Sequence, residues 1–142
     1  MRRFVVDASV AIKWYVPEPE SEAAIQLLAE DCSLFSPDLL FPEVGSIIWK
    51  KIQRREISRD DGHGILLALS RTRIAVQASS KFRLAEHALE VATATMSSFY
   101  DSLYVSLAAL TGFPLVTADR RLLKRLDHGP FARHLVWVED AV

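Results

Sequence analysis

The chain has 142 residues, half of them hydrophobic, and its 17 basic and 18 acidic side chains give a formal net charge of −1. This balance excludes a global positive field that would draw the protein to nucleic acid, the single cysteine Cys32 excludes an intramolecular disulfide, and no apolar run approaches a membrane span. We therefore expect one soluble, cytoplasmic domain over residues 1–142, with no membrane contact and with any nucleic-acid binding confined to a local surface.

The first element is a short apolar run, Phe4 to Val6, that stops directly on Asp7 and is followed by Ser9. This pattern is typical of a buried parallel strand whose carboxyl end passes into a helix. Asp7 would then lie at the tip of the strand, and in open α/β sheets ligands bind at that rim, where the strand order reverses. Asp and Ser are also common helix N-caps, so a capping role is the competing interpretation.

Helices and short strands alternate through the first two thirds of the chain. Pro17 and Pro19 end a helical segment, and Ser58 followed by Asp61 resembles a capping box that opens a later helix. Hydrophobic residues at one-face spacing predict a buried stripe on each longer helix. The predicted elements are a helical turn or two over 10–15, a helix over 20–30 (stripe Ala24, Leu27, Leu28), a strand over 33–35 closed by residues 36–38, a helix ending at 55 (stripe Val44, Ile47, Ile48, Ile52), a helix from 58 (stripe Ile65, Leu66, Leu69), a strand over 74–76 and a helix over 85–92 (stripe Ala85, Ala88, Leu89, Ala92).

The last third of the chain contains one long helix, one short helix and two strands. Ser98 has the position of an N-cap, Gly112 that of the C′ residue, and Pro114 follows just beyond. Strands that alternate with helices predict a mostly parallel sheet covered on both faces, which is a three-layer α/β/α arrangement. The predicted elements are the helix from 98 to 112 (stripe Tyr104, Leu107, Ala108, Thr111), a strand over 115–117, a basic helix over 120–126 and a fifth strand over 135–138.

Four acidic residues stand where a strand ends or a helix begins. Asp7 ends the first strand, Glu43 opens a helix, Asp101 lies in the first turn of another, and Asp119 follows the fourth strand. Each also suits a structural role, because helix N-termini favour acidic side chains. Glu43 and Asp101, however, point along the predicted buried stripes of their helices, which capping does not require.

Carboxylates that converge beside a hydrophobic core repel one another and lose hydration. The cost is several kcal/mol per ion unless a positive charge compensates, and a divalent cation is the obvious candidate. Hard oxygen ligands without clusters of Cys or His suit Mg²⁺ or Mn²⁺ and disfavour zinc. The four histidines are scattered without ligand spacing, so we leave them out of the candidate site.

The four acids lie in the motifs VDAS (residues 6–9), PEV (42–44), YDSLY (100–104) and VTADRRL (116–122). Together these motifs resemble those of the PIN-domain nucleases, and the size of the chain is similar to that of a VapC-type toxin from a bacterial or archaeal toxin–antitoxin pair. The resemblance covers essentially the whole chain. Each motif is weak alone, but their order and spacing are fairly specific. Ser102 is one departure, because many relatives have Ala after the acid.

The resemblance implies a PIN-like three-layer α/β/α fold with a mostly parallel five-stranded sheet in the order 3-2-1-4-5. That order places the tips of strands one and four side by side. It also implies a Mg²⁺- or Mn²⁺-dependent endoribonuclease that hydrolyses RNA phosphodiester bonds. Asp7, Asp101 and Asp119 would then bind metal directly or through water, with Glu43 as a further ligand or as the group that orients the attacking water.

Further residues are candidates for substrate contact. Ser9 and Thr117 have hydroxyls near the same rim, although either could bond to a local backbone group instead. Arg120 and Arg121 are placed to contact RNA phosphates, with a solvated helix face as the alternative.

A toxin of this family implies a cognate VapB-like antitoxin and a homodimer. The apolar run over residues 11–16 has more large side chains than a short helix buries on one side. Trp14 or Tyr15 would then line an exposed groove with part of the second helix and accept an antitoxin helix. The alternative is that both aromatic side chains pack on the core.

Two enzymatic alternatives fail on particular positions, and one non-enzymatic alternative stays open. A haloacid-dehalogenase-like phosphotransferase needs a second Asp two residues after the first, where this chain has Ser9. A response-regulator receiver needs a phosphoacceptor Asp after the third strand, where residues 76–78 are Val, Gln and Ala. A catalytically inactive PIN-like binding module remains, although the chain retains all four acids.

Overall fold

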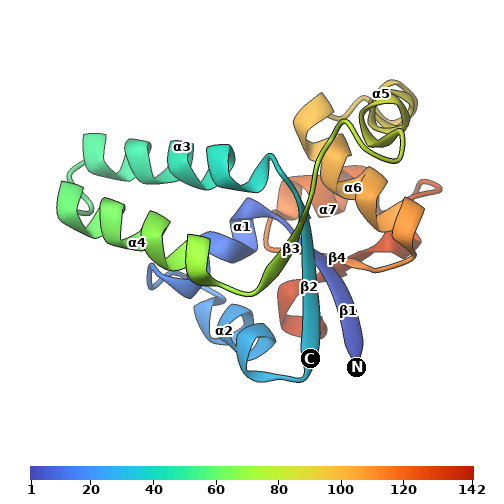
Figure 1. The fold of residues 1–142 in the computed structure, drawn as a ribbon. Coiled ribbons are helices and arrows are strands. Elements are labelled where there is room, and N and C mark those ends of the chain that lie inside the picture. The colour runs from blue at the N-terminus through green and yellow to red at the C-terminus, as the bar shows by residue number, and fades with distance from the viewer.

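The computed structural model describes all residues, 1–142, and contains one five-stranded sheet. All strand pairs are parallel and the order is β3-β2-β1-β4-β5, so the predicted order 3-2-1-4-5 is confirmed. Helices cover both faces of the sheet, and the chain termini lie together at the end where β1 begins (Figure 1). The elements are β1 Arg2–Val6, α1 Ala8–Ala11, η1 Ile12–Trp14, α2 Ser21–Ala29, β2 Cys32–Pro37, α3 Leu40–Gln53, α4 Arg59–Arg71, β3 Ile74–Gln77, α5 Leu84–Thr95, α6 Phe99–Thr111, β4 Leu115–Thr117, α7 Arg120–Leu126, η2 Ala132–His134, β5 Leu135–Trp137 and η3 Val138–Asp140.

The central strand β1 divides the hydrophobic core into two clusters. Side chains alternate between the faces of a strand, so Phe4 and Val6 pack on one side and Val5 packs on the other. The first cluster lies under α1 to α4, and the second lies under α5, α6 and α7. Because β1 is buried on both faces, its last three residues, Phe4 to Val6, are all apolar. The next residue, Asp7, is polar and follows directly at the carboxyl end of the strand.

Helices α3 and α4 form a two-helix arm that extends to one side of the sheet (Figure 1). The Ser58–Asp61 capping box that opens α4 is confirmed, with the Asp61 amide donating to Ser58 Oγ at 3.0 Å. Gly62 is buried where the two helices meet, and a Cβ there would lie 2.9 Å from Ile48 Cγ2 and from Ile52 Cδ1. The absence of a side chain at this position therefore allows the arm to close.

The prediction ends the second strand two residues too early. In the structure β2 continues through Ser36 and Pro37, which pair with Val76 and Gln77 of β3. Ser36 is fully buried, and its hydroxyl donates to the Val6 carbonyl at 2.9 Å. A polar residue can therefore occupy this strand interior because its hydrogen bond is satisfied within the sheet.

Some predicted buried positions are wrong because the helices bury narrower faces than their hydrophobic content indicates. Leu28 is 42% exposed on α2, and Leu89 is 57% exposed on α5. Helix α5 packs mainly on α6 and buries Leu84, Ala88 and Val91, a stripe rotated from the predicted one. Leu66 on α4 and Thr111 at the end of α6 are likewise exposed.

The expectation of a groove with the second helix is also wrong, because the groove at this place lies against α4 and is lined by Tyr15 and Trp14. The Trp14 side chain is 8% exposed, packs in the first core cluster, and donates from Nε1 to the Ala24 carbonyl at 2.9 Å. Tyr15 is half-buried and its hydroxyl bonds to Thr72 at the end of α4. No helix combines the length and apolar character that a membrane crossing requires.

The two glycines of α4 predict opposite effects of alanine. Gly64→Ala adds a Cβ that meets nothing within 4 Å, so improved helix propensity should stabilise the protein by about 0.5–1 kcal/mol. Gly62→Ala forces the added Cβ against Ile48 and Ile52, and we expect a net destabilisation of about 1 kcal/mol. Thermal and urea unfolding of the two variants measure the difference. Equal stabilisation by both substitutions would contradict the close α3–α4 packing.

Candidate active site

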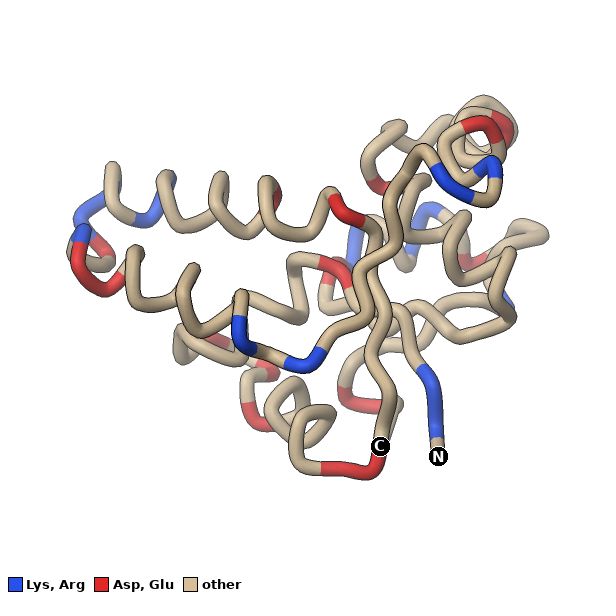
Figure 2. Tube along the Cα trace, viewed as in Figure 1, with Lys and Arg blue, Asp and Glu red and all other residues tan.

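The carboxyl ends of β1 and β4 meet at one edge of the sheet. Val6 pairs with Val116, so the residues that follow, Asp7 and Thr117, lie side by side at the ends of their strands. This is the point where the strand order changes direction. Acidic residues gather where the strands end and α3 begins (Figure 2).

Asp7 is the most buried of the four acids, with 6% exposure. Its carboxylate accepts hydrogen bonds from Ser9 Oγ at 2.5 Å, from Thr117 Oγ1 at 2.6 Å and from the Val10 amide at 3.3 Å. Burial raises its pKa to about 6, the three hydrogen bonds oppose that rise, and the charge of Asp119 adds to it. Asp7 is also the N-cap of α1, so the capping interpretation and the site interpretation both describe the same side chain.

The hydroxyls of Ser9 and Thr117 tie the two strand ends together. Each hydroxyl has one proton and donates it to Asp7. As acceptors, Ser9 Oγ takes the Ala118 amide at 2.9 Å and Thr117 Oγ1 takes the Asp119 amide at 3.1 Å. In this geometry both predicted substrate residues orient Asp7 and the backbone of the following turn.

Asp119 and Asp101 begin helices on the other side of the sheet. Asp119 is the N-cap of α7, and its Oδ1 accepts from the amides of Arg121 at 3.0 Å and Leu122 at 3.2 Å. Asp101 lies in the first turn of α6, where its amide donates to Ser98 Oγ at 3.1 Å. Burial raises the pKa of Asp101, the Ser98 hydroxyl opposes the rise, and the charge of Asp119 adds to it.

Glu43 completes the set from the first turn of α3, together with a tyrosine that sequence reasoning assigned only to the core. Burial raises the pKa of Glu43, Tyr104 lowers it and the charge of Asp101 raises it again. Tyr104 lies one turn after Asp101 on α6, and its buried hydroxyl approaches Glu43 without forming a well-aligned hydrogen bond. Burial raises the pKa of Tyr104, and the charges of Glu43, Asp7 and Asp101 raise it further. The (i, i+3) spacing from Asp101 is the sequence signal that could have placed it here.

The structure brings the four predicted acids into one electrostatic cluster. Asp119 acts on both Asp7 and Asp101, and Asp101 acts on Glu43. No three Asp, Glu, His or Cys side chains lie close enough to bind one ion by themselves. Mg²⁺ usually takes only one or two carboxylates and keeps several waters, so this donor set suits a hydrated hard cation. The unpartnered Tyr104 hydroxyl among these acids fits the same interpretation, because a water held there would satisfy it.

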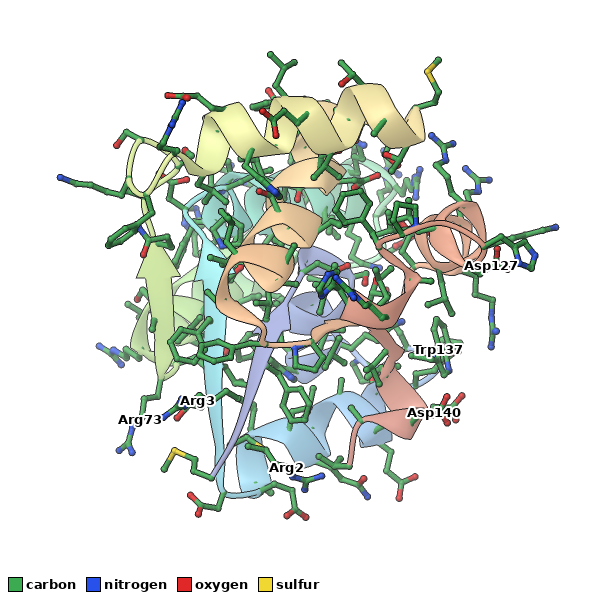
Figure 3. The ribbon with its side chains drawn as sticks, turned by 90° about the vertical axis from the view of Figure 1, so that its right-hand side faces the viewer. Arg2, Arg3, Arg73, Asp127, Trp137 and Asp140 are labelled. Carbon is green, nitrogen blue, oxygen red and sulfur yellow. The ribbon has the colours of Figure 1, made fainter.

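Three arginines of α7 differ in their contacts. The Arg120 guanidinium lies 4.2 Å from the ring centroid of Trp137, whose side chain is at the outer edge of the sheet on the side of α7 (Figure 3). Arg121 is exposed and forms no salt bridge. Arg125, which sequence reasoning did not single out, donates to the Met96 carbonyl at 2.7 Å and lowers the pKa of Asp101. It is the one basic residue whose charge acts on the raised pKa of a candidate site acid.

The chain is similar to proteins of one family. A family model described as "PIN domain" matches residues 4–129. Ribonuclease VapC3 of Pyrobaculum aerophilum is 32% identical over 123 residues, which cover 87% of this chain and 94% of that protein. The crystal structure of PAE2754 from Pyrobaculum aerophilum has a TM-score of 0.69 at 25% identity, over 97% of this chain and 85% of that one. A toxin–antitoxin complex from Klebsiella pneumoniae has a TM-score of 0.67 at 16% identity, over 94% and 95% of the two chains, and is similar in fold alone.

The raised pKa of Asp7 predicts a stability that falls as the pH rises. Folding raises this pKa from 3.8 to about 6, so the folded state binds the proton more tightly, and the stability it contributes is complete below about pH 4 and lost as the pH passes through about 6. A pKa difference of about two corresponds to about 3 kcal/mol. In EDTA near neutral pH, we therefore expect Asp7→Asn to be more stable than the wild type by about 1–3 kcal/mol, with no gain at acidic pH.

Urea unfolding at a series of pH values measures this effect. Asp31→Asn is the matched control, because Asp31 is exposed and its side chain makes no hydrogen bond or salt bridge. A pH-independent effect of Asp7→Asn, or an equal effect of Asp31→Asn, would contradict the buried-carboxylate account.

Proposed function

Because the chain belongs to the PIN-domain family, we propose that it is a Mg²⁺- or Mn²⁺-dependent endoribonuclease and the toxin of a VapBC-type toxin–antitoxin pair. The observation that carries the proposal is the gathering of four carboxylates at the switch point of a parallel sheet, where the charge of Asp119 raises the pKa of Asp7 and of Asp101, and the charge of Asp101 raises that of Glu43. Negative charges gathered in one place favour the binding of a cation. The name of the VapC3 relative supports RNA as the substrate.

Asp7, Asp101 and Asp119 are the residues that would hold the metal, directly or through water. A bound Mg²⁺ or Mn²⁺ supplies a positive charge that lowers the pKa of bound water and stabilises charge on the phosphate. The protein's own contribution is positional. Ser9 and Thr117 hold the Asp7 carboxylate in one orientation through their hydroxyl protons. They also favour its ionised form, which is the form a cation binds.

Glu43 has the properties of a group that orients and deprotonates the attacking water. Its pKa is raised by burial and by Asp101, which brings a carboxylate closer to the operating pH where a general base is most effective. Tyr104 lies against it and favours its ionised form. Arg121, exposed at the start of α7 and free of salt bridges, is available to contact an RNA phosphate, whereas Arg120 is partly committed to Trp137.

An antitoxin and a second copy of the chain are the proposed protein partners. The VapC name of the relative and the toxin–antitoxin complex among the similar structures support the first. A groove between the end of η1 and α4 suits an amphipathic helix, with an apolar wall that includes Ile57 and Ile65 and an acidic rim of Asp60 and Asp61. This groove involves α4 in place of the predicted second helix. Exposed large side chains on other helices, such as Trp49, offer apolar surface for a homodimer, and light scattering of the purified chain tests that state.

Asparagine substitutions separate the charge of the acids from their capping role. Asn caps helices as well as Asp, so Asp7→Asn and Asp119→Asn keep the starts of α1 and α7 and remove only a charge. We expect each variant to cleave RNA at least about a hundredfold more slowly than the wild type in Mg²⁺ or Mn²⁺, with the fold retained.

The measurement is cleavage of structured RNAs by the purified chain, with Asp31→Asn as the control and EDTA as the blank. Wild-type cleavage by the Asp7 and Asp119 variants would contradict the site and favour pure capping. A folded wild-type chain that cleaves no RNA with either metal would favour the inactive binding module.

A further inference from the structure

A groove opens beside the candidate active site, between η1, α3 and the end of β4. Its inner end is formed by Ser9 and Ala118, which hydrogen-bond to each other at the strand ends. Ser9 also donates to Asp7, so the inner end of the groove is in direct contact with the most buried site acid. From there it follows α3 toward the tip of the α3–α4 arm.

The floor of the groove is a fixed ionic network. Lys51 Nζ lies 2.8 Å from Glu18 Oε2, and Lys13 Nζ lies 3.3 Å from Glu18 Oε1. Both lysine side chains are largely buried, with 11% exposure for Lys13 and 15% for Lys51. Glu20 and Glu56 approach the same lysines from outside the groove. The positive charges of Lys13 and Lys51 are therefore already paired with carboxylates, and the network holds the shape of the groove.

The outer wall has two cations that no acid compensates. Lys50 lies in the last turn of α3 and Arg54 is the C-cap residue four positions later, so their side chains are neighbours at this end of the helix. Both are exposed, and neither forms a salt bridge. The α3 helix is therefore acidic in its first turn, at Glu43, and basic in its last (Figure 2).

The site needs such a surface because four carboxylates repel a polyanion and the chain has a net charge of −1. Attraction must come from cations beside the acids, and unpaired cations attract more strongly than those already bound to Glu. Resting on the proposed ribonuclease function, we propose that Lys50 and Arg54 in this groove bind the phosphate backbone of a single-stranded RNA segment next to the scissile bond.

The test uses the double variant Lys50→Gln/Arg54→Gln, which keeps good helix formers at two exposed positions. Binding of a fluorescein-labelled single-stranded RNA of about 20 nucleotides is followed by anisotropy in EDTA, where affinity is read without cleavage. The matched control is Arg71→Gln/Arg73→Gln, two exposed cations without salt bridges at the opposite rim, where Arg73 lies near the starts of the strands (Figure 3).

We expect at least about tenfold weaker binding, and a slope of log affinity against log salt that is smaller by about 1.4, because each lost phosphate contact removes about 0.7 for single strands. The control should bind as the wild type does, and Lys50→Arg/Arg54→Lys should restore affinity. Unchanged affinity in the groove variant, or an equal loss in the control, would overturn the inference.

Cleavage in Mg²⁺ or Mn²⁺ is measured separately, so the two proposals fail in different ways. If the wild type cleaves RNA and the groove variant binds RNA with unchanged affinity, the groove proposal is wrong and the nuclease proposal stands. If RNA binding depends on Lys50 and Arg54 but the wild type cleaves no RNA, the nuclease proposal is wrong and the groove is an RNA-binding surface.

Discussion

The carboxylate of Asp7, buried at the end of the central strand, is the constraint on which the rest of the site depends. Burial favours the protonated acid, whereas the hydroxyls of Ser9 and Thr117 and the amide of Val10 favour the carboxylate, and the balance is a pKa of about 6. Near neutral pH the side chain therefore ionises inside the protein and lowers its stability. Residues that lower the stability of a fold in this way are concentrated at functional sites, where the charge is needed for binding or chemistry.

Capping and catalysis are compatible at this rim for a geometric reason. In a parallel α/β sheet, the carboxyl end of a strand and the amino end of the next helix meet at the same edge. Asp7 and Asp119 occupy this junction after β1 and β4, and both accept backbone amides of the helix that follows. The amides fix the position of the carboxylates, and Oδ2 of Asp119 accepts no hydrogen bond from the protein. A cap can therefore also be a ligand, and the two interpretations drawn from the sequence do not compete.

Local sequence signals predicted the elements best where Gly and Pro residues mark the end of an element. Gly112 and Pro114 bracket the end of α6, and the following strand and helix match their predicted residues 115–117 and 120–126. Periodicity failed where it had to identify the neighbour of a helix, because Leu89 belongs to a plausible stripe but α5 packs mainly on α6. Tyr104 was assigned to the core and is indeed buried. Its second property, a hydroxyl facing three acids, depends on the sheet order, which no local pattern contains.

Although the net charge of the chain is only −1, its surface carries two opposite local fields. Carboxylates meet where β1, β4, α3 and α6 converge, and unpaired cations lie at the far end of α3, at Lys50 and at the C-cap residue Arg54. A polyanion that approaches the acids meets repulsion that two separate sources can offset. A divalent cation acts at the reacting phosphate, whereas the groove acts on its neighbours along the strand. The first contribution depends on metal and on the ionisation of Asp7, and the second depends on salt. Affinity and cleavage should therefore respond to different solution conditions, even though Ser9 joins the groove to the site through a single hydroxyl.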